Sequence, residues 1–301
     1  MNSAPHTQPD DGHRRAFMAG LAAYIIWGIF PLYFKVIEAA GAVEILSHRI
    51  IWSVPFALLL ILARRQIGDL IRAIKTPKVL GLLALSSLMI AINWGLYIWA
   101  VNNGFILQAS LGYYINPLMY VIVGVAAFGE KLQKLQIFAV LLAAIGVAIL
   151  TFYGGVFPWI SLILASSFTA YGVIRKQVEV GSIPGLLIET VFLILPALLY
   201  LHHIWGQEEI IFGSETNITV WLLAAGPITV LPLLAFTVAA RGLKLSTLGI
   251  LQYIAPTMQF MCALYLGETF TLAHALCFGC IWTAVALFSF NALKRPKPIR
   301  A

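Results

Sequence analysis

The 301-residue chain carries too little charge for a soluble globular protein. Hydrophobic residues make up 61% of it and charged residues 10%, whereas a soluble domain typically has about a quarter charged and about half apolar residues. This composition excludes a water-exposed globule and indicates an integral membrane protein. A net charge of +7 points to nucleic acid only in a soluble protein, so no nucleic-acid partner is expected and the positions of the charges matter more.

Membrane-spanning helices are predicted from the stretches that lack Asp, Glu, Lys and Arg, and from one stretch that Glu44 and Arg49 interrupt. Such a helix needs about 20 mostly apolar residues, since each residue adds about 1.5 Å and the hydrocarbon layer is about 30 Å thick. Asn102-Asn103-Gly104 and Gly154-Gly155 break the two longest stretches into two helices each. In chain order, ten transmembrane helices are predicted within residues 16–34, 44–63, 79–129, 135–174, 190–207, 216–240, 245–267 and 269–293.

The positions of Lys and Arg favour this count, because short cytoplasmic loops are enriched in these residues. With ten spans and a cytoplasmic N-terminus, all of the 19 basic residues except Lys35 and Arg49 fall on the inner side. Residues 1–15 are predicted to be a disordered cytoplasmic tail and residues 294–301 a basic cytoplasmic tail. Both termini are therefore expected in the cytoplasm.

The sequence between the tails repeats itself. Tyr114-Ile115-Asn116-Pro117 recurs as Tyr253-Ile254-Ala255-Pro256, and Gly129-Glu130 recurs as Gly267-Glu268, where both Gly-Glu pairs are expected to end helices. The chain is thus predicted to contain two five-helix units, 16–153 and 158–293, and an odd number of spans gives them inverted topology. Inverted repeats are typical of secondary transporters, which work by alternating access around a site between the halves. The chain also lacks the G-x-x-x-x-G-K-[ST] motif, so ATP bound to this chain is not expected to drive transport.

Three stretches carry a resemblance to a known family: YIIWGIFPLYFK at 24–35, EILSHRIIWS at 44–53 and AINWGLYIWAVNNGFILQASLGYYINP at 91–117. With the repeated Pro and Gly-Glu marks, the chain resembles the EamA family of the drug/metabolite transporter superfamily, and within it the RarD-type chloramphenicol-sensitive permeases. The resemblance extends from Arg15 to the end of the chain. It implies a ten-helix permease of the bacterial inner membrane, with no catalytic residues and a substrate that membership does not define.

Polar side chains at membrane depth are the candidates for function, because they are costly there. Arg49 is interpreted either as a structural or snorkelling arginine or as a group that attracts an anionic or carbonyl-bearing solute. Together with aromatic and amide residues it predicts a cavity for a small amphipathic or zwitterionic molecule, although an interfacial belt or helix-to-helix hydrogen bonds explain any single member. The predicted cavity residues are Trp27, His48, Arg49, Asn93, Trp94, Tyr97, Tyr113, Asn116, Tyr171, Gln252 and Tyr253.

Two further pairs occupy matching positions in the repeats. Glu189 and His48 are candidates for proton coupling, with chance placement near a helix end as the alternative. Pro117 and Pro256 are interpreted as plain kinks or as bends that gate the cavity.

Other motifs give weaker indications. Cys277 and Cys280 form a C-x-x-C in an apolar segment, where small packing residues are the favoured reading, and neither a metal nor a cofactor is expected. Ala139, Ala143 and Gly146 permit a close helix contact, which leaves open whether it is made within the chain or in a homodimer.

The main hypothesis is a secondary transporter that exports small organic metabolites and amphipathic drugs, with lipid and a small-molecule substrate as its partners. The alternatives are a membrane-embedded enzyme and a receptor or scaffold without flux. An enzyme would need clustered catalytic groups such as H-E-x-x-H, and the six His residues do not have that spacing.

Overall fold

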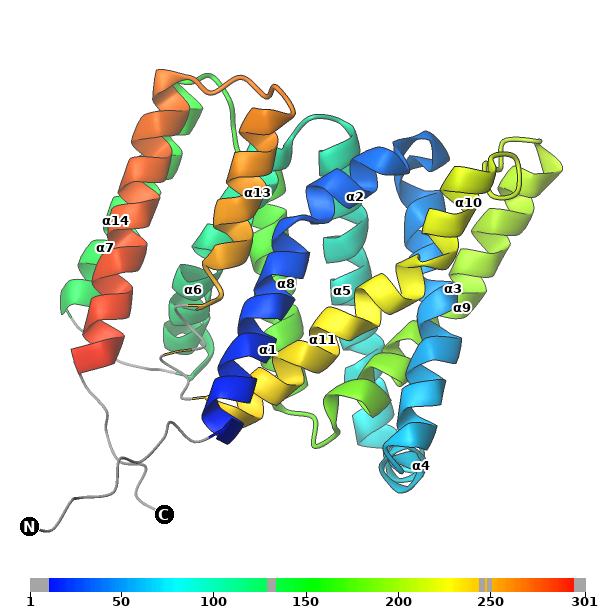
Figure 1. The fold of residues 1–301 in the computed structure, drawn as a ribbon. Coiled ribbons are helices and arrows are strands. Elements are labelled where there is room, and N and C mark those ends of the chain that lie inside the picture. Colours follow the sequence, from blue (N-terminus) through cyan, green and yellow to red (C-terminus); the bar gives the residue numbers. More distant parts are fainter. Residues whose placement is uncertain (1–10, 129–133, 244–246, 248–250, 295–301) are drawn as a thin grey trace, which may run out of the picture.

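The structure is a computed structural model of the chain and describes residues 11–128, 134–243, 247 and 251–294 (Figure 1). Within these residues every regular element is a helix, which confirms the all-α prediction. The helices are α1 (Asp11–Gly28), α2 (Phe30–Val36), the 3₁₀ turn η1 (Glu38–Ala40), α3 (Gly41–Ala63), α4 (Ile67–Ile74), α5 (Pro77–Asn102), α6 (Ile106–Phe128), α7 (Lys134–Phe152), α8 (Trp159–Lys176), α9 (Ser182–Gly206), α10 (Thr216–Leu223), α11 (Ala225–Gly242), α13 (Ile254–Tyr265) and α14 (Leu272–Lys294).

Several of these helices can cross a membrane. In the described residues five are long and apolar enough to do so: Glu38–Ala63, Pro77–Asn102, Lys134–Phe152, Ser182–Gly206 and Thr216–Ala240. The sequence Gly12–Val36 makes a sixth if α1 and α2, bent by 42° at Ile29, form one broken span. The protein is therefore a multi-pass membrane protein, while the count of ten spans stays a prediction.

The long apolar stretches divide where the sequence predicts. Asn102 is the last residue of α5 and Gly104 adopts φ 75°, a left-handed conformation that glycine accommodates without strain. The second stretch breaks between α7 and α8, where Gly155 has φ 67°. At the N-terminal end α1 already begins at Asp11, so residues 11–15, expected in the tail, are helical.

The two repeated prolines lie differently in their helices. Pro117 is inside α6, whereas Pro256 is the third residue of α13. A proline in the first turn of a helix costs no hydrogen bond, because the N–H groups there have no intrahelical partner. Pro256 thus marks the start of α13, and the Gly129-Glu130 pair lies outside the described residues.

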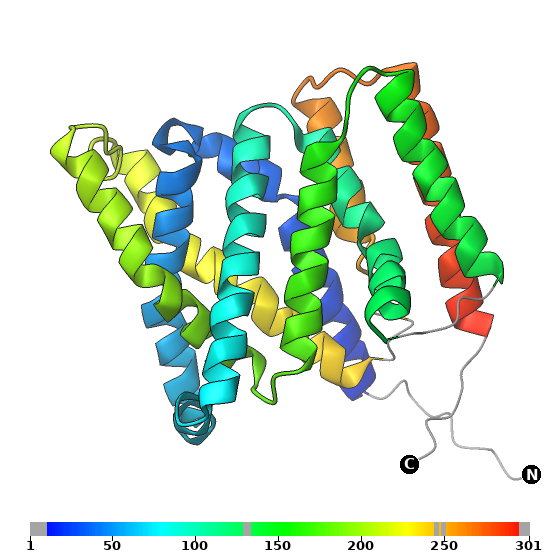
Figure 2. The same cartoon turned by 180° about the vertical axis from the view of Figure 1, so that it is seen from behind.

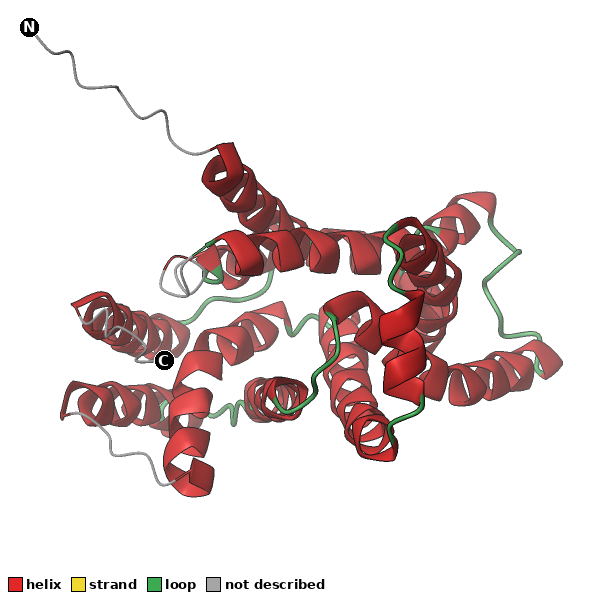
Figure 3. Ribbon diagram, turned by 90° about the horizontal axis from the view of Figure 1, so that it is seen from below, coloured by secondary structure: helices red, strands yellow, loops and turns green. Residues whose placement is uncertain are grey.

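The helices form two layers, with most running along one common direction and α11 inclined across them (Figures 1 and 3). Figures 1 and 2 show α1, α11, α13 and α14 on one face and α5, α6, α7, α8 and α9 on the other. The most extensive pairings join α7 to α14, α1 to α11, α3 to α9, α6 to α8 and α5 to α8.

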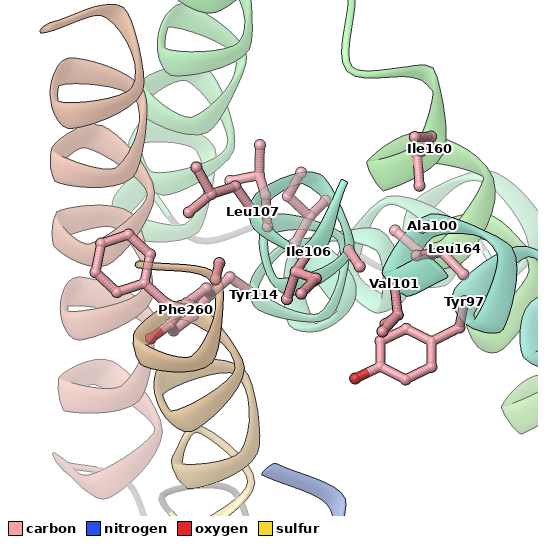
Figure 4. Packing of buried hydrophobic residues seen from close by; sticks show 14 of the residues in the cluster. Tyr97, Ala100, Val101, Ile106, Leu107, Tyr114, Ile160, Leu164 and Phe260 are labelled. Carbon is pink, nitrogen blue, oxygen red and sulfur yellow. The ribbon is translucent and has the colours of Figure 1, made fainter. Parts of the chain in front are cut away.

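One large apolar cluster joins the layers. Figure 4 shows Tyr97 and Val101 of α5 close to Leu164 of α8, and Tyr114 of α6 close to Phe260 of α13. Because these residues come from helices far apart in the sequence, the cluster holds the bundle together and positions the polar side chains that lie within it.

The small residues of α7 make a contact within the chain. Ala139 and Ala143 are buried, and a Cβ added at Gly146 would lie 2.9 Å from Cβ of Cys280 and 3.0 Å from the carbonyl oxygen of Cys277. The stripe therefore packs against α14, and the C-x-x-C residues are part of that packing. The described residues contain no group of three or more His, Cys, Asp and Glu side chains that could hold a metal ion.

Candidate functional site

Arg49 lies deep in the bundle. It is the ninth residue of α3, so it stands about 12 Å along the helix from its start, well inside a hydrocarbon layer of about 30 Å. Its side chain is buried, with 3% of the residue exposed. A charge in such a position needs a specific environment, because an unpaired buried ion is strongly unfavourable.

Aromatic rings provide most of that environment. The guanidinium carbon of Arg49 lies 4.5 Å from the ring centroid of Trp94, 5.4 Å from that of Phe34 and 5.7 Å from that of Phe30. Its Nε donates a hydrogen bond of 3.1 Å to Oγ1 of Thr229 on α11. Among the described residues no carboxylate lies within 4.0 Å of it, so cation–π contacts and one hydroxyl hold the charge.

Two tyrosines and an asparagine border this aromatic box. The Tyr113 hydroxyl donates to Oδ1 of Asn93 at 3.1 Å, and Nδ2 of Asn93 donates to the carbonyl of Leu164 at 3.0 Å. The Tyr97 ring packs edge-on against Tyr113, with centroids 5.5 Å apart. Its hydroxyl is buried and has no hydrogen-bond partner in the described structure.

Gln259 extends the polar surface from α13. Its Nε2 donates a 3.2 Å hydrogen bond to the carbonyl of Trp27, whose ring contacts those of Tyr24 and Phe236. Oε1 of Gln259 is buried without a partner among the described residues. Cys262, nearly one turn later on α13, donates to the carbonyl of Gly28 at 3.7 Å, so this face of α13 packs against the end of α1.

Glu189 belongs to a second cluster. Its Oε1 accepts a 2.6 Å hydrogen bond from the Ser86 hydroxyl and lies 3.6 Å from Nε of Arg175, and its Oε2 is 3.4 Å from the Tyr171 hydroxyl. Glu189 is 1% exposed. A Cβ at Gly185 would collide with the Arg175 guanidinium, so glycine at this position lets the arginine lie against α9. The cluster joins α5, α8 and α9.

His48 lies in a third place, away from the ring contacts of Arg49. Its Nδ1 accepts a 3.1 Å hydrogen bond from Nε1 of Trp52, and its ring stacks on Phe212 at 4.5 Å. The cavity beside it has a volume of about 360 Å³ and includes the side chains of Trp205 and His202 on α9. Because Arg49 follows His48 directly, the two point about 100° apart around α3 and meet different neighbours.

The other predicted cavity residues lie towards α6 and α13. Tyr253 stacks on Tyr114 with centroids 6.3 Å apart. Asn116 is buried and its Oδ1 has no partner among the described residues. Gln252 is half-buried in the turn before α13. The structure thus brings Arg49, Asn93, Trp94, Tyr97 and Tyr113 together and distributes the rest around them.

Two carboxylates outside the predicted set hold backbone segments. Glu44 accepts hydrogen bonds from the N–H groups of Ile211, at 3.1 Å, and Phe212, at 2.9 Å. Glu268 accepts from the N–H groups of Ile106 and Leu107, the latter at 2.8 Å. The repeated Gly-Glu motif pointed to Glu268, but as the end of its own helix, whereas it also caps the start of α6.

Glu268 follows α13 in the loop that leads to α14, outside the spanning segments. Burial raises the pKa of its carboxyl group, and this effect exceeds the opposing stabilisation of the charged form by the two N–H groups and Lys35. Lys35 itself forms an ion pair with Glu38, with Nζ 2.6 Å from Oε2.

Comparison with known proteins identifies the family. Protein RarD of Escherichia coli is 43% identical over 93% of this chain and 95% of its own. An uncharacterized transporter of Vibrio cholerae is 43% identical over 93% and 94%, and the chloramphenicol-sensitive protein RarD of Pseudomonas aeruginosa is 32% identical over 92% and 94%. The model of the EamA-like transporter family matches residues 14–152. The chain belongs to the EamA-like transporter family.

A solved crystal structure supports the fold of this EamA-family protein. It superposes with a TM-score of 0.59 at 18% sequence identity and covers 94% of this chain and 100% of its own. The resemblance predicted from the sequence is thus confirmed, and the protein is a membrane transporter. In such a protein, a buried cation among aromatic rings and unsatisfied polar groups is suited to binding a solute.

Proposed function

We propose that this EamA-family protein is a secondary transporter that exports small organic solutes, metabolites or amphipathic drugs, by alternating access. The observation that carries the proposal is Arg49, a buried cation more than two turns into α3 that contacts Trp94 of α5 and Thr229 of α11. A polar site between helices of the first and second parts of the chain is where a transporter of inverted repeats places its solute.

The arrangement of ten spans in two inverted five-helix repeats is part of the proposal. Support comes from the helix pairings: if α1, α3, α5, α6 and α7 correspond in order to α8, α9, α11, α13 and α14, exchanging the two sets converts the α1–α11 pairing into α8–α5. The pairings α3–α9, α6–α13 and α7–α14 are converted into themselves. Such a pattern is expected of a pseudo-two-fold axis between the halves.

The proposed location is the bacterial inner membrane with both termini in the cytoplasm. The start of α1, the helix α4 and the end of α8 lie at one end of the bundle (Figures 1 and 2). The basic residues Arg14, Arg72 and Arg175 belong to these segments. Enrichment in positive charge favours this end as the cytoplasmic one.

Flux measurements test the function directly. Full-length protein in liposomes is expected to accelerate exchange of at least one solute from a panel of carboxylates, amino acids, sugars, nucleosides and chloramphenicol. Chloramphenicol belongs in the panel because a relative is named chloramphenicol-sensitive. If every solute moves no faster than in protein-free liposomes, the transport proposal is rejected in favour of an enzyme or a receptor.

Proton coupling through Glu189 or His48 is proposed as the driving mechanism. Glu189 is buried, and the Arg175 guanidinium, the Ser86 hydroxyl and the Tyr171 hydroxyl face it. His48 faces Glu44 at 3.9 Å and Trp52. A pH gradient imposed across the liposomes is expected to drive flux in the native protein and not in Glu189→Gln or His48→Ala; gradient dependence that survives in both variants excludes this mechanism.

A further inference from the structure

The charge of Arg49 has no counter-ion in the described part of the protein. Buried arginines are usually paired, because the cost of removing a charge from water is offset only by an opposite charge and by hydrogen bonds. Here the offset comes from three aromatic rings and from one hydroxyl group. The site therefore has a net positive charge, and binding of one anion would stabilise it.

The hydrogen-bonding geometry of Arg49 narrows the kind of anion. Thr229 occupies only Nε, and the two terminal nitrogens donate to no described group. Parallel N–H groups on a guanidinium match the two oxygens of a carboxylate, and a single guanidinium balances a single negative charge.

Two further buried groups lack partners among the described residues, one on Tyr97, whose ring lies 5.9 Å from that of Phe34 in the box, and one on Gln259 of α13. The Tyr97 hydroxyl is a donor and Gln259 Oε1 is an acceptor, both buried and both unsatisfied in the described structure. A solute with a hydroxyl group could donate to or accept from the Tyr97 hydroxyl, and the aromatic rings around Arg49 make the surroundings of the site apolar.

The buried carboxylates of Glu44 and Glu189 already have partners within the protein. Glu44 accepts backbone hydrogen bonds from Ile211 and Phe212, and Glu189 is bound to Ser86 and Arg175. Among the described residues, no carboxylate near Arg49 is therefore free to pair with the ammonium group of a zwitterion. Removing that ammonium group from water would be unfavourable.

We propose that the solute of this site is an apolar or aromatic monocarboxylate with a neutral hydrogen-bond donor such as a hydroxyl, and that Arg49 binds its carboxylate. The proposal rests on the transport function proposed above and sharpens the expected amphipathic or zwitterionic solute to an anion.

Four probes with a common phenyl group test the proposal: 3-phenyllactate, 3-phenylpropionate, 3-phenylpropionamide and phenylalanine. Binding to the purified full-length protein is measured by titration calorimetry, with inorganic phosphate as a further anion. Phenyllactate is expected to bind at least about tenfold more tightly than the amide and than phenylalanine, because only the carboxylate without an ammonium group satisfies Arg49. Equal binding of the amide or phenylalanine, tighter binding of phosphate, or no binding of either carboxylate overturns the proposal.

Variants locate the binding group. Arg49→Gln is expected to weaken carboxylate binding about 10- to 100-fold and to leave the affinity for the amide unchanged. Arg49→Lys is expected to have an intermediate carboxylate affinity, because lysine keeps the positive charge but lacks the two parallel N–H groups of the guanidinium. Arg72→Gln is the matched control, since Arg72 is exposed on α4. A merely structural arginine would weaken all four probes equally, which would refute the assignment. The probe series on the native protein decides the question even if an Arg49 variant does not fold.

The liposome assay separates this proposal from the function on which it rests. If another solute is transported and no carboxylate binds, the monocarboxylate assignment fails and the transport function stands. If phenyllactate binds and no solute of the panel moves, the transport function fails.

Discussion

Replacing Glu189 by glutamine removes the charge opposite Arg175 with little change in shape. At a separation of 3.6 Å and an effective dielectric constant of about 20, the attraction between the two charges is about 4–5 kcal/mol. Desolvation offsets part of this, and the Arg175 side chain keeps 16% of its surface exposed, so we expect Glu189→Gln to lower the free energy of unfolding by about 2–3 kcal/mol. The Ser86 hydrogen bond survives, because the amide oxygen accepts it equally well.

A double-mutant cycle isolates the pair. Arg175→Gln is expected to cost a similar amount, and the double variant at least about 1 kcal/mol less than the sum of the two, because no unpaired charge is left behind. The unfolding of purified protein in detergent, followed by tryptophan fluorescence or by loss of helical circular dichroism, provides the four free energies. Ser86→Ala serves as a control that removes a hydrogen bond without removing charge. Additive costs would show that the two charges do not stabilise each other and would refute the reasoning.

Three further predictions concern packing, helix capping and topology. Gly146→Leu is expected to lower stability by more than about 2 kcal/mol, because its side chain would overlap Cys277 and Cys280, and a melting temperature equal to that of Ala148→Leu on the same helix would argue against the close contact. Glu268→Ala is expected to speed hydrogen exchange of the Ile106 and Leu107 amides by about tenfold or more, and Glu268→Gln is expected to give an exchange rate between those of Glu268→Ala and the native protein. Unchanged exchange would show that the carboxylate does not cap α6. In a cysteine-free background, Glu215→Cys is expected to react with a membrane-impermeant maleimide from outside the cell and Arg72→Cys only after permeabilisation, and the reverse pattern would invert the topology.

The sequence predicts the helices well because their signal is local. Asn102-Asn103-Gly104 ends α5 as expected, since turn residues determine backbone conformation where they stand. The short helix α4 was not predicted, because Ile67–Ile74 is too short and too charged to register as a span. The break between α1 and α2 at Ile29 is not predicted although it has a local signal, since Gly28 ends α1 and Pro31 lies in the first turn of α2.

Side-chain partners are predicted less well than helices, because they depend on how helices are rotated against one another. The sequence predicts Arg175 only as a cytoplasmic charge and Glu189 only as a residue for proton coupling. Nothing in the sequence indicates that the two side chains form the ion pair seen in the structure. His48 and Arg49 were assigned to one cavity, although neighbours on a helix face different partners. The cluster of Asn93, Tyr97 and Tyr113 was easier to predict, because spacings of three and four residues place polar groups on one helix face.

The carboxylates that bind backbone N–H groups have a consequence for how the chain is completed during synthesis. Glu44 emerges from the ribosome long before its partners Ile211 and Phe212. Its carboxylate therefore lacks these hydrogen bonds while more than half of the chain is synthesised. The N–H groups of Ile106 and Leu107 at the start of α6 likewise lack their acceptor until Glu268 has been synthesised. These hydrogen bonds join the two proposed repeats, residues 16–153 and 158–293, so neither repeat can form them before the other has been inserted. A truncated first half would leave Glu44 and the start of α6 without these partners and would be open to quality-control proteases.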